Sequence, residues 1–186
     1  KRQGQGAIPS LVRSLLGITP GSGKRDRALA LDRAENIGIV EPENRVFLND
    51  LLDLKQTQEL RTLYDAMDAQ ARKEGKQALL ADILTRLTAA QSVLIVVEDL
   101  HWADSITLGY LARLAAALTD CQALMVFTSR AEGDPLDTSW RASVGEAPIV
   151  TWDLSPLRKE ESILLVSAFI DAGDSLAKRC ICLLYT

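Results

Sequence analysis

The segment VLIVVEDLHWAD, residues 93–104, decides the fold of this chain. Its first five residues are apolar and mostly β-branched, which is typical of a strand covered on both faces of a parallel sheet. Two carboxylates, Glu98 and Asp99, follow at once, and the only histidine, His101, comes two residues after them. Because ionised carboxylates at the edge of a core are costly without a partner, we expect this pair either to face a cation or to cap a helix.

Strand and helix patterns alternate after residue 91. The predicted elements are a helix over residues 106–120, a strand over 121–130, a short helix around Trp140, a strand over 147–154 and a helix over 157–173. Either Asp104 or Ser105 is expected to cap the first of these helices at its N-terminus. Alternation of this kind predicts an α/β fold built on a parallel sheet of three strands.

Residues 1–91 carry helical patterns instead. Apolar residues recur at helical spacing over residues 10–18, 26–38, 45–54 and 58–90, with glycine and proline between them. The last range fits one long helix with a weak point at Gly75 and fits two helices equally well. We therefore expect a large helical segment before the strand that starts near residue 93.

Composition and charge limit the classes of function. Lys and Arg total 21 against 25 Asp and Glu, a net charge of −4, which disfavours nucleic acid as a partner. No apolar run approaches the roughly 18 residues of a membrane span, so we expect no membrane insertion. The cysteines (Cys121, Cys180 and Cys182) lack zinc-binding spacing, and a cytoplasmic location is expected.

The ends of the two predicted strands carry groups suited to a nucleotide. In open α/β sheets, ligands bind beyond the carboxyl ends of the strands. Glu98 and Asp99 end one strand, and Ser129 and Arg130 end the next. Mg²⁺ accepts one or two carboxylates together with substrate phosphates, and an arginine can neutralise charge on the phosphate oxygens. An apolar strand ending in an acidic pair is the Walker B pattern of P-loop NTPases, although such acids can also simply cap the next helix.

The residues that follow make this pattern more specific. Glu98-Asp99-Leu-His-Trp-Ala-Asp104 resembles the Walker B region of the signalling ATPases called STAND, and Thr128-Ser129-Arg130 resembles their sensor strand. Six segments agree in order with the ATPase module of class III adenylate/guanylate cyclase-type bacterial regulators: LVRSLLGI, FLNDLLDL, YDAMDAQARKEGKQALL, EDLHWAD, TSRAEGDPLDTSWR and DLSPLRKEE. The resemblance covers roughly residues 8–181.

This resemblance implies a role for each matched residue. Asp99 is the expected Mg²⁺ ligand and Glu98 its catalytic partner, although alternation along a strand leaves their order open. The residues expected near the bound nucleotide are Ser129, Arg130, His101 and Asp104. The resemblance also implies ATP and Mg²⁺ as cofactors. It further implies a regulatory ATPase that switches an attached output domain, such as a nucleotide cyclase, and that is also attached to helical repeats.

One part of such a site is missing from the sequence. No G-x-x-x-x-G-K-[ST] motif occurs, and the stretch GITPGSGKR (residues 17–25) has the wrong spacing and Arg25 in place of Ser or Thr. We expect this stretch to be a turn. The resemblance places the phosphate loop upstream, so these 186 residues are expected to be inactive as an ATPase on their own.

Three segments are expected along the chain. They are a helical segment of the ATPase module (residues 1–91), the strands with their helices (92–181), and a foreign tail (182–186). The main alternative function is a non-enzymatic helical module that binds a protein partner without nucleotide. A helicase or DNA-loading ATPase is disfavoured by the acidic charge.

Overall fold

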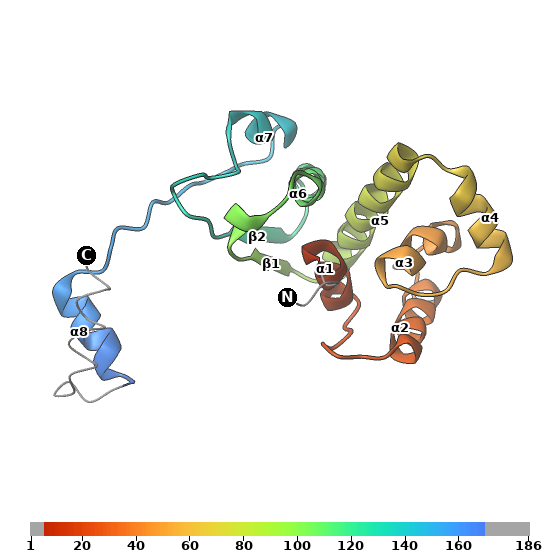
Figure 1. Cartoon of the computed structure of the whole chain (residues 1–186), viewed down its shortest axis with the longest axis horizontal. Helices are drawn as coiled ribbons and strands as arrows, with labels where there is room; N and C mark the ends of the chain where they lie inside the picture. The colour runs from red at the N-terminus through yellow and green to blue at the C-terminus, as the bar shows by residue number, and fades with distance from the viewer. Residues whose placement is uncertain (1–5, 170–186) are drawn as a thin grey trace. The chain divides into compact units, whose positions relative to one another are not determined.

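The computed structural model describes residues 6–169 of the chain. It separates into two compact units, residues 1–148 and 149–186. The first unit contains α1 (Ala7–Leu15), α2 (Lys24–Asn36), the 3-10 turn η1 (Pro42–Asn44), α3 (Arg45–Leu51), α4 (Gln58–Ala66), α5 (Ala69–Ala90), β1 (Val93–Val97), the 3-10 turn η2 (Leu100–Trp102), α6 (Ser105–Ala117), β2 (Ala123–Phe127) and α7 (Thr138–Ser143) (Figure 1). The second unit contains α8 (Lys159–Ser167).

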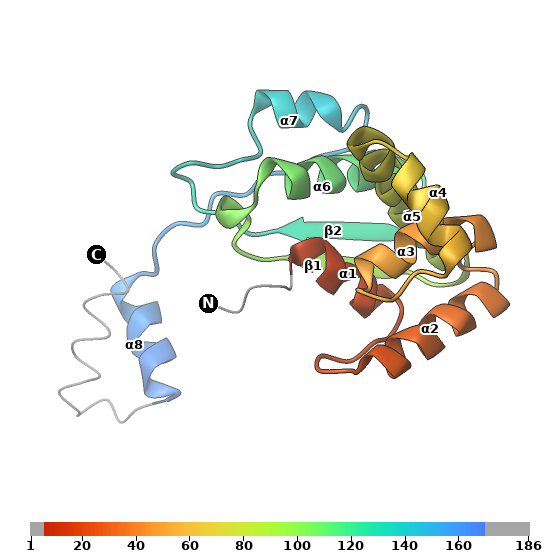
Figure 2. The ribbon, with the colours of Figure 1, turned by 45° about the vertical axis from the view of Figure 1, so that its right-hand side comes forward.

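The two strands form a parallel pair, as the sequence predicts. They are hydrogen-bonded in register from Val93 opposite Ala123 to Val97 opposite Phe127. The connection runs through η2 and α6, and Figure 2 shows α6 lying alongside the sheet. Parallel strands require a crossover connection of this kind, so the described residues form a mixed α/β structure.

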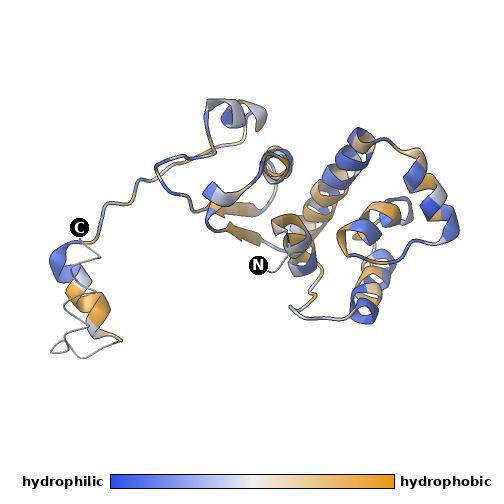
Figure 3. Cartoon of the chain, in the orientation of Figure 1, coloured by the Kyte–Doolittle hydropathy of each residue, from blue (hydrophilic) through white to orange (hydrophobic). Residues whose placement is uncertain are grey.

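Only one face of this strand pair is covered by the described residues. Val93, Ile95 and Val97 pack into the core with residues of α1, α5 and α6. The alternate residues on the other face are exposed, namely Leu94, Val96, Leu124 and Val126. Both strands are hydrophobic along their whole length (Figure 3). The expectation of cover on both faces is therefore wrong for this part of the chain, because every packed helix lies on one side.

The predicted third strand, residues 147–154, does not form. The structure shows no regular secondary structure from residue 147 to residue 158. Val150, Trp152 and Leu154 are exposed. Apolar character alone suggested a strand, but a strand also needs a neighbour for its backbone hydrogen bonds, and the described sheet holds β1 and β2 alone.

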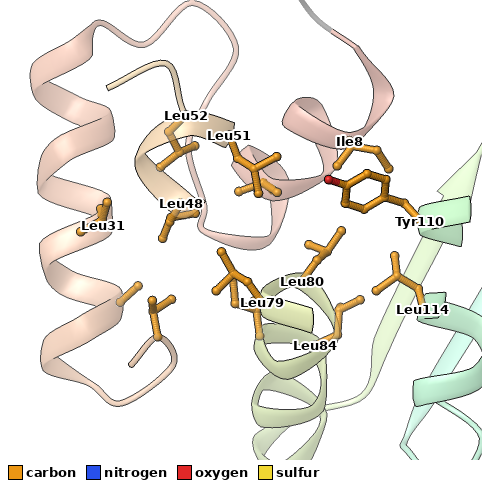
Figure 4. Packing of buried hydrophobic residues seen from close by; sticks show 14 of the residues in the cluster. Ile8, Leu31, Leu48, Leu51, Leu52, Leu79, Leu80, Leu84, Tyr110 and Leu114 are labelled. Atoms are coloured by element: carbon orange, nitrogen blue, oxygen red, sulfur yellow. The ribbon is translucent and has the colours of Figure 1, made fainter. Parts of the chain in front are cut away.

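The main hydrophobic core joins the helical segment to the sheet. Its labelled members are Ile8, Leu31, Leu48, Leu51, Leu52, Leu79, Leu80, Leu84, Tyr110 and Leu114 (Figure 4). These residues come from α1, α2, α3, α5 and α6, except that Leu52 directly follows α3, and Ile95 of β1 belongs to the same cluster. The helical segment therefore supports the strands through shared burial of apolar surface.

Residues 58–90 form two helices that meet at Met67 and Asp68. Met67 is extended, and the Asp68 carboxylate accepts a hydrogen bond from the Ala71 N–H at 2.7 Å, which caps α5. Gly75, the predicted weak point, lies inside continuous helix. Its missing side chain makes room for the ring of Phe47 from α3. The two-helix alternative is confirmed, but its boundary lies eight residues before the predicted one.

The remaining predicted elements are largely confirmed. The predicted helices over residues 10–18, 26–38 and 45–54 correspond to α1, α2 and α3, and the short helix around Trp140 is α7. Of the helix predicted over residues 157–173, the part from residue 159 to 167 forms α8, and residues 170–173 lie outside the described residues, as does the predicted tail at 182–186. Within residues 6–169, no helix is long and apolar enough to cross a membrane.

Candidate functional site

The two strand ends are joined by backbone hydrogen bonds just beyond the sheet. The Thr128 N–H donates to the Val97 carbonyl at 3.1 Å, and the Leu100 N–H donates to the Thr128 carbonyl at 2.8 Å. The Thr128 hydroxyl oxygen also accepts a hydrogen bond from the Asp99 N–H at 3.1 Å. The predicted meeting of the strand ends at one edge is therefore confirmed, and Thr128 holds Asp99 in place. Sequence reasoning did not identify this role, although a polar residue directly after a buried strand was the available signal.

Asp99 has a left-handed backbone conformation, with φ 55° and ψ 44°. A non-glycine residue in this region costs on the order of 1–3 kcal/mol unless the surroundings impose it. The other such residue, Asp53, follows the end of α3, where left-handed residues commonly terminate helices. Asp99 instead begins a turn between strand and helix. The expected alternation of side chains between the two faces of the strand therefore does not extend to Asp99.

The acidic pair does not cap the following helix. Asp104 caps α6 by accepting a hydrogen bond from the Thr107 N–H at 2.7 Å. This bond and a second one from the Thr107 side chain lower the pKa of Asp104 below its usual value. The Asp99 carboxylate makes no capping hydrogen bond to η2. The sequence left Asp104 and Ser105 open as caps, and the structure selects Asp104, whose carboxylate is engaged with Thr107.

His101 lies beside Asp99, as the sequence spacing suggests. Its side chain is only 9% exposed, and its Nδ1 lies 4.0 Å from Asp99 Oδ1. Neither ring nitrogen has a hydrogen-bond partner among the described residues. The ring of Trp102 lies 5.0 Å from the His101 ring between centroids and is itself 77% exposed. Trp102 therefore lies on the surface beside His101 and does not belong to either hydrophobic core.

A small second core fixes the turn that carries Asp99 and His101. Leu100 is buried in a cluster with Leu111, Trp140 and Val144, and this packing holds η2 against α6 and α7. Trp140 itself is held by a hydrogen bond from Nε1 to the Leu108 carbonyl at 3.0 Å. Burial of Leu100 thus fixes the position of the backbone that carries Asp99 and His101.

Glu98, Ser129 and Arg130 are exposed at the same edge of the sheet. Arg130 has no ion-pair partner within residues 6–169, and the same holds for Glu98. No hydrogen bond or ion pair joins Arg130 to either carboxylate in that range. The structure therefore brings the two loops together through Thr128, with the charged side chains directed to solvent and available to a ligand.

The donor set at this edge suits one class of metal site. Among the described residues, no group of three or more His, Cys, Asp and Glu side chains converges as an all-protein metal cage would require. Mg²⁺ bound with a nucleotide needs less, because substrate phosphates and water complete its octahedron. Glu98 and Asp99 could supply the one or two carboxylates that such a complex needs.

Comparisons with protein-family models, with curated proteins and with solved structures give no match to this chain.

Proposed function

We propose that this chain is part of a nucleotide-dependent regulatory ATPase of the P-loop type. The observation that carries the proposal is the pairing of two parallel strands whose ends place Asp99 against Thr128, next to Ser129 and Arg130. Ligands of open α/β sheets bind at this edge. The acidic pair is also free of the capping role that would explain it structurally.

Each residue of the strand-end site has a different role in the proposed hydrolysis. Asp99, fixed by Thr128 and flanked by His101, is the expected ligand of Mg²⁺, which supplies neutralisation of the phosphate oxygens when bound. Glu98 is exposed and can orient the attacking water and accept its proton. Arg130 can form charge-assisted hydrogen bonds to the terminal phosphate, where negative charge grows during transfer. His101 acts on Asp99 and not on the nucleotide.

The phosphate loop and the output domain belong to the full-length protein in this proposal. Backbone N–H groups of a phosphate loop supply most of the hold on a triphosphate. Hydrolysis would then change the contacts of the strand-end loops and switch an attached domain such as a nucleotide cyclase.

Replacement of Asp99 by Asn in the full-length protein tests the proposal. Loss of a metal ligand should lower Mg²⁺-dependent ATP hydrolysis by about 100-fold or more, because metal ions contribute several kcal/mol of charge stabilisation. The matched control is Asp120→Asn, which changes an exposed carboxylate at the opposite end of the sheet. Hydrolysis at the wild-type rate by Asp99→Asn would rule out the assignment.

A non-enzymatic interaction module stands as the second candidate because of the exposed sheet face. Leu94, Val96, Leu124 and Val126 form an apolar surface on one side of the strands. Contiguous apolar surfaces of this kind mark binding sites for other protein segments. Full-length protein that binds a protein partner but no nucleotide would favour this candidate.

A further inference from the structure

A pocket of about 330 Å³ lies between the start of α2 and the segment that follows α3. Its lining residues are Lys24, Arg25, Ala28, Arg45, Asn49, Leu54, Lys55 and Thr57. Four of these side chains are cationic and none is a carboxylate, in a chain whose net charge is −4. We call this site the basic pocket.

Helix stability does not explain the cations at the start of α2. Lys24 and Arg25 occupy the first turn of the helix, where the helix dipole disfavours positive charge. Asp26 already satisfies the Gly23 N–H at 3.1 Å, so this N-terminus has its own cap. Gathering further cations beside these two adds repulsion between like charges. A bound anion would reduce that repulsion.

Ion pairs neutralise only part of the basic pocket. Arg45 is bound to Asp32 at 2.7 Å and also to Glu35. Burial works to lower the pKa of Arg45, but its hydrogen bond to Asp32 and the charges of both acids outweigh burial and raise it.

The other three cations are more available. Lys24 lies 3.6 Å from Asp53, whose carboxylate also lies 3.8 Å from Arg27. Because both Lys24 and Asp53 are largely exposed, their pair is weak and Lys24 can exchange it for another anion. Arg25 and Lys55 have no ion-pair partner within residues 6–169. The basic pocket therefore offers two unpaired cations and one weakly paired cation to a ligand.

We propose that the basic pocket binds a small phosphate-bearing molecule. A phosphoryl group carries the multiple negative charges that two unpaired cations can match, and an arginine can bind it in a bidentate manner while a lysine adds a point charge. The pocket volume lies at the lower end of the range of roughly 300–1,000 Å³ found for small-molecule sites. Because the positive charge is built into the protein, binding needs no metal ion. The site shares no residue with the strand-end site and goes beyond the proposed ATPase function.

Titration of the 186-residue chain with inorganic pyrophosphate, without Mg²⁺ and at constant ionic strength, tests this proposal. We expect saturable binding with a Kd on the order of 1 mM by calorimetry or phosphorus NMR. Arg25→Gln and Lys55→Gln should each weaken binding by about tenfold, because each removes a charge-assisted contact. The matched control is Arg33→Gln, which removes another exposed arginine of α2 outside the pocket and should leave the affinity unchanged.

The contrary results are equally specific. No saturable binding by the wild type, or equal weakening by Arg25→Gln and Arg33→Gln, would overturn the proposal, since either result means that pyrophosphate senses only overall charge. Arg130→Gln removes the exposed cation at the strand ends. Loss of pyrophosphate binding in that variant would place the anion at the strand ends and would also overturn the proposal, whereas failure of ATP hydrolysis in the full-length protein would leave it intact.

Discussion

Replacement of Gly75 by alanine should destabilise the protein, although alanine is the better helix former. Gly75 lies within α5, and a Cβ atom there would overlap Cζ, Cε1 and Cε2 of the Phe47 ring. Gly109, within α6, is the matched control because its added Cβ would meet only Gln77 Nε2 at 3.5 Å, an ordinary contact. The same chemical change therefore has opposite consequences at the two positions.

The magnitudes follow from two opposing effects. Alanine gains up to about 1 kcal/mol over glycine in a helix interior. Overpacking a core typically costs about 1–3 kcal/mol, because the Phe47 ring must leave its position against α5. We expect Gly75→Ala to lose on the order of 1 kcal/mol of unfolding free energy in total. Gly109→Ala should gain about 0.5–1 kcal/mol, since only the helix-propensity effect acts there.

Thermal unfolding followed by circular dichroism measures this difference. For a chain of this size, each kcal/mol shifts Tm by about 2–4 °C, so the two variants should differ by about 3–8 °C. Phe47→Ala should reverse the sign of the Gly75→Ala effect, because it removes the ring that the new methyl group meets. If Gly75→Ala is as stable as Gly109→Ala in the wild-type background, the packing of Phe47 on α5 is incorrectly described.

Three further predictions concern single side chains. Asp104→Ala should lower the unfolding free energy by about 1 kcal/mol at pH 7 through loss of the α6 cap. Because folding lowers the pKa of Asp104, the stabilisation by its carboxylate is complete above the ordinary pKa of about 3.9 and is lost as the pH falls below that value. Denaturant unfolding that shows the same stability difference between wild type and Asp104→Ala at pH 7 and at pH 2 would contradict this prediction. The exposed apolar sheet face should make the 186-residue chain self-associate. Leu124→Lys should reduce this association in light scattering without unfolding the chain, whereas Ile95→Lys, at a buried position, should unfold it. Association unchanged by Leu124→Lys would show that the exposed face is not the contact. Arg130→Ala in the full-length protein should weaken ATP binding about tenfold more than ADP binding, because only ATP carries the terminal phosphate, and equal weakening would indicate a structural role.

The sequence predicted those parts of the fold that local patterns determine. The five apolar residues before Glu98 identified β1, and the apolar run before Thr128 identified β2, because buried strands read as short apolar runs. β2 is shorter than the predicted strand over residues 121–130, since it begins at Ala123 and ends at Phe127. Residues 147–154 have a similar apolar character and yet form no strand, since strand formation also depends on a neighbouring backbone that a local pattern does not report.

The candidate site shows the same limit. His101 follows Asp99 by two positions in the sequence, and its Nδ1 lies 4.0 Å from Asp99 Oδ1 in the structure. The left-handed backbone of Asp99 and its hydrogen bond to Thr128 depend on a residue that lies 29 positions away in the chain. The sequence pattern predicts a weak point in the helix at Gly75, because it does not report the packing of Phe47 against this glycine, which is a tertiary contact.

In the proposed function, the carboxylates at the strand ends hold the metal ion of a bound nucleotide. Replacement of Mg²⁺ by Fe²⁺ in the full-length protein with ATP, followed by addition of hydrogen peroxide and ascorbate, tests this assignment, since radicals formed at the metal cut only nearby backbone and mass spectrometry locates the cuts. We expect cuts around Asp99 and Thr128 that disappear in Asp99→Asn. Cuts that fall elsewhere, or that persist unchanged in Asp99→Asn, would contradict it.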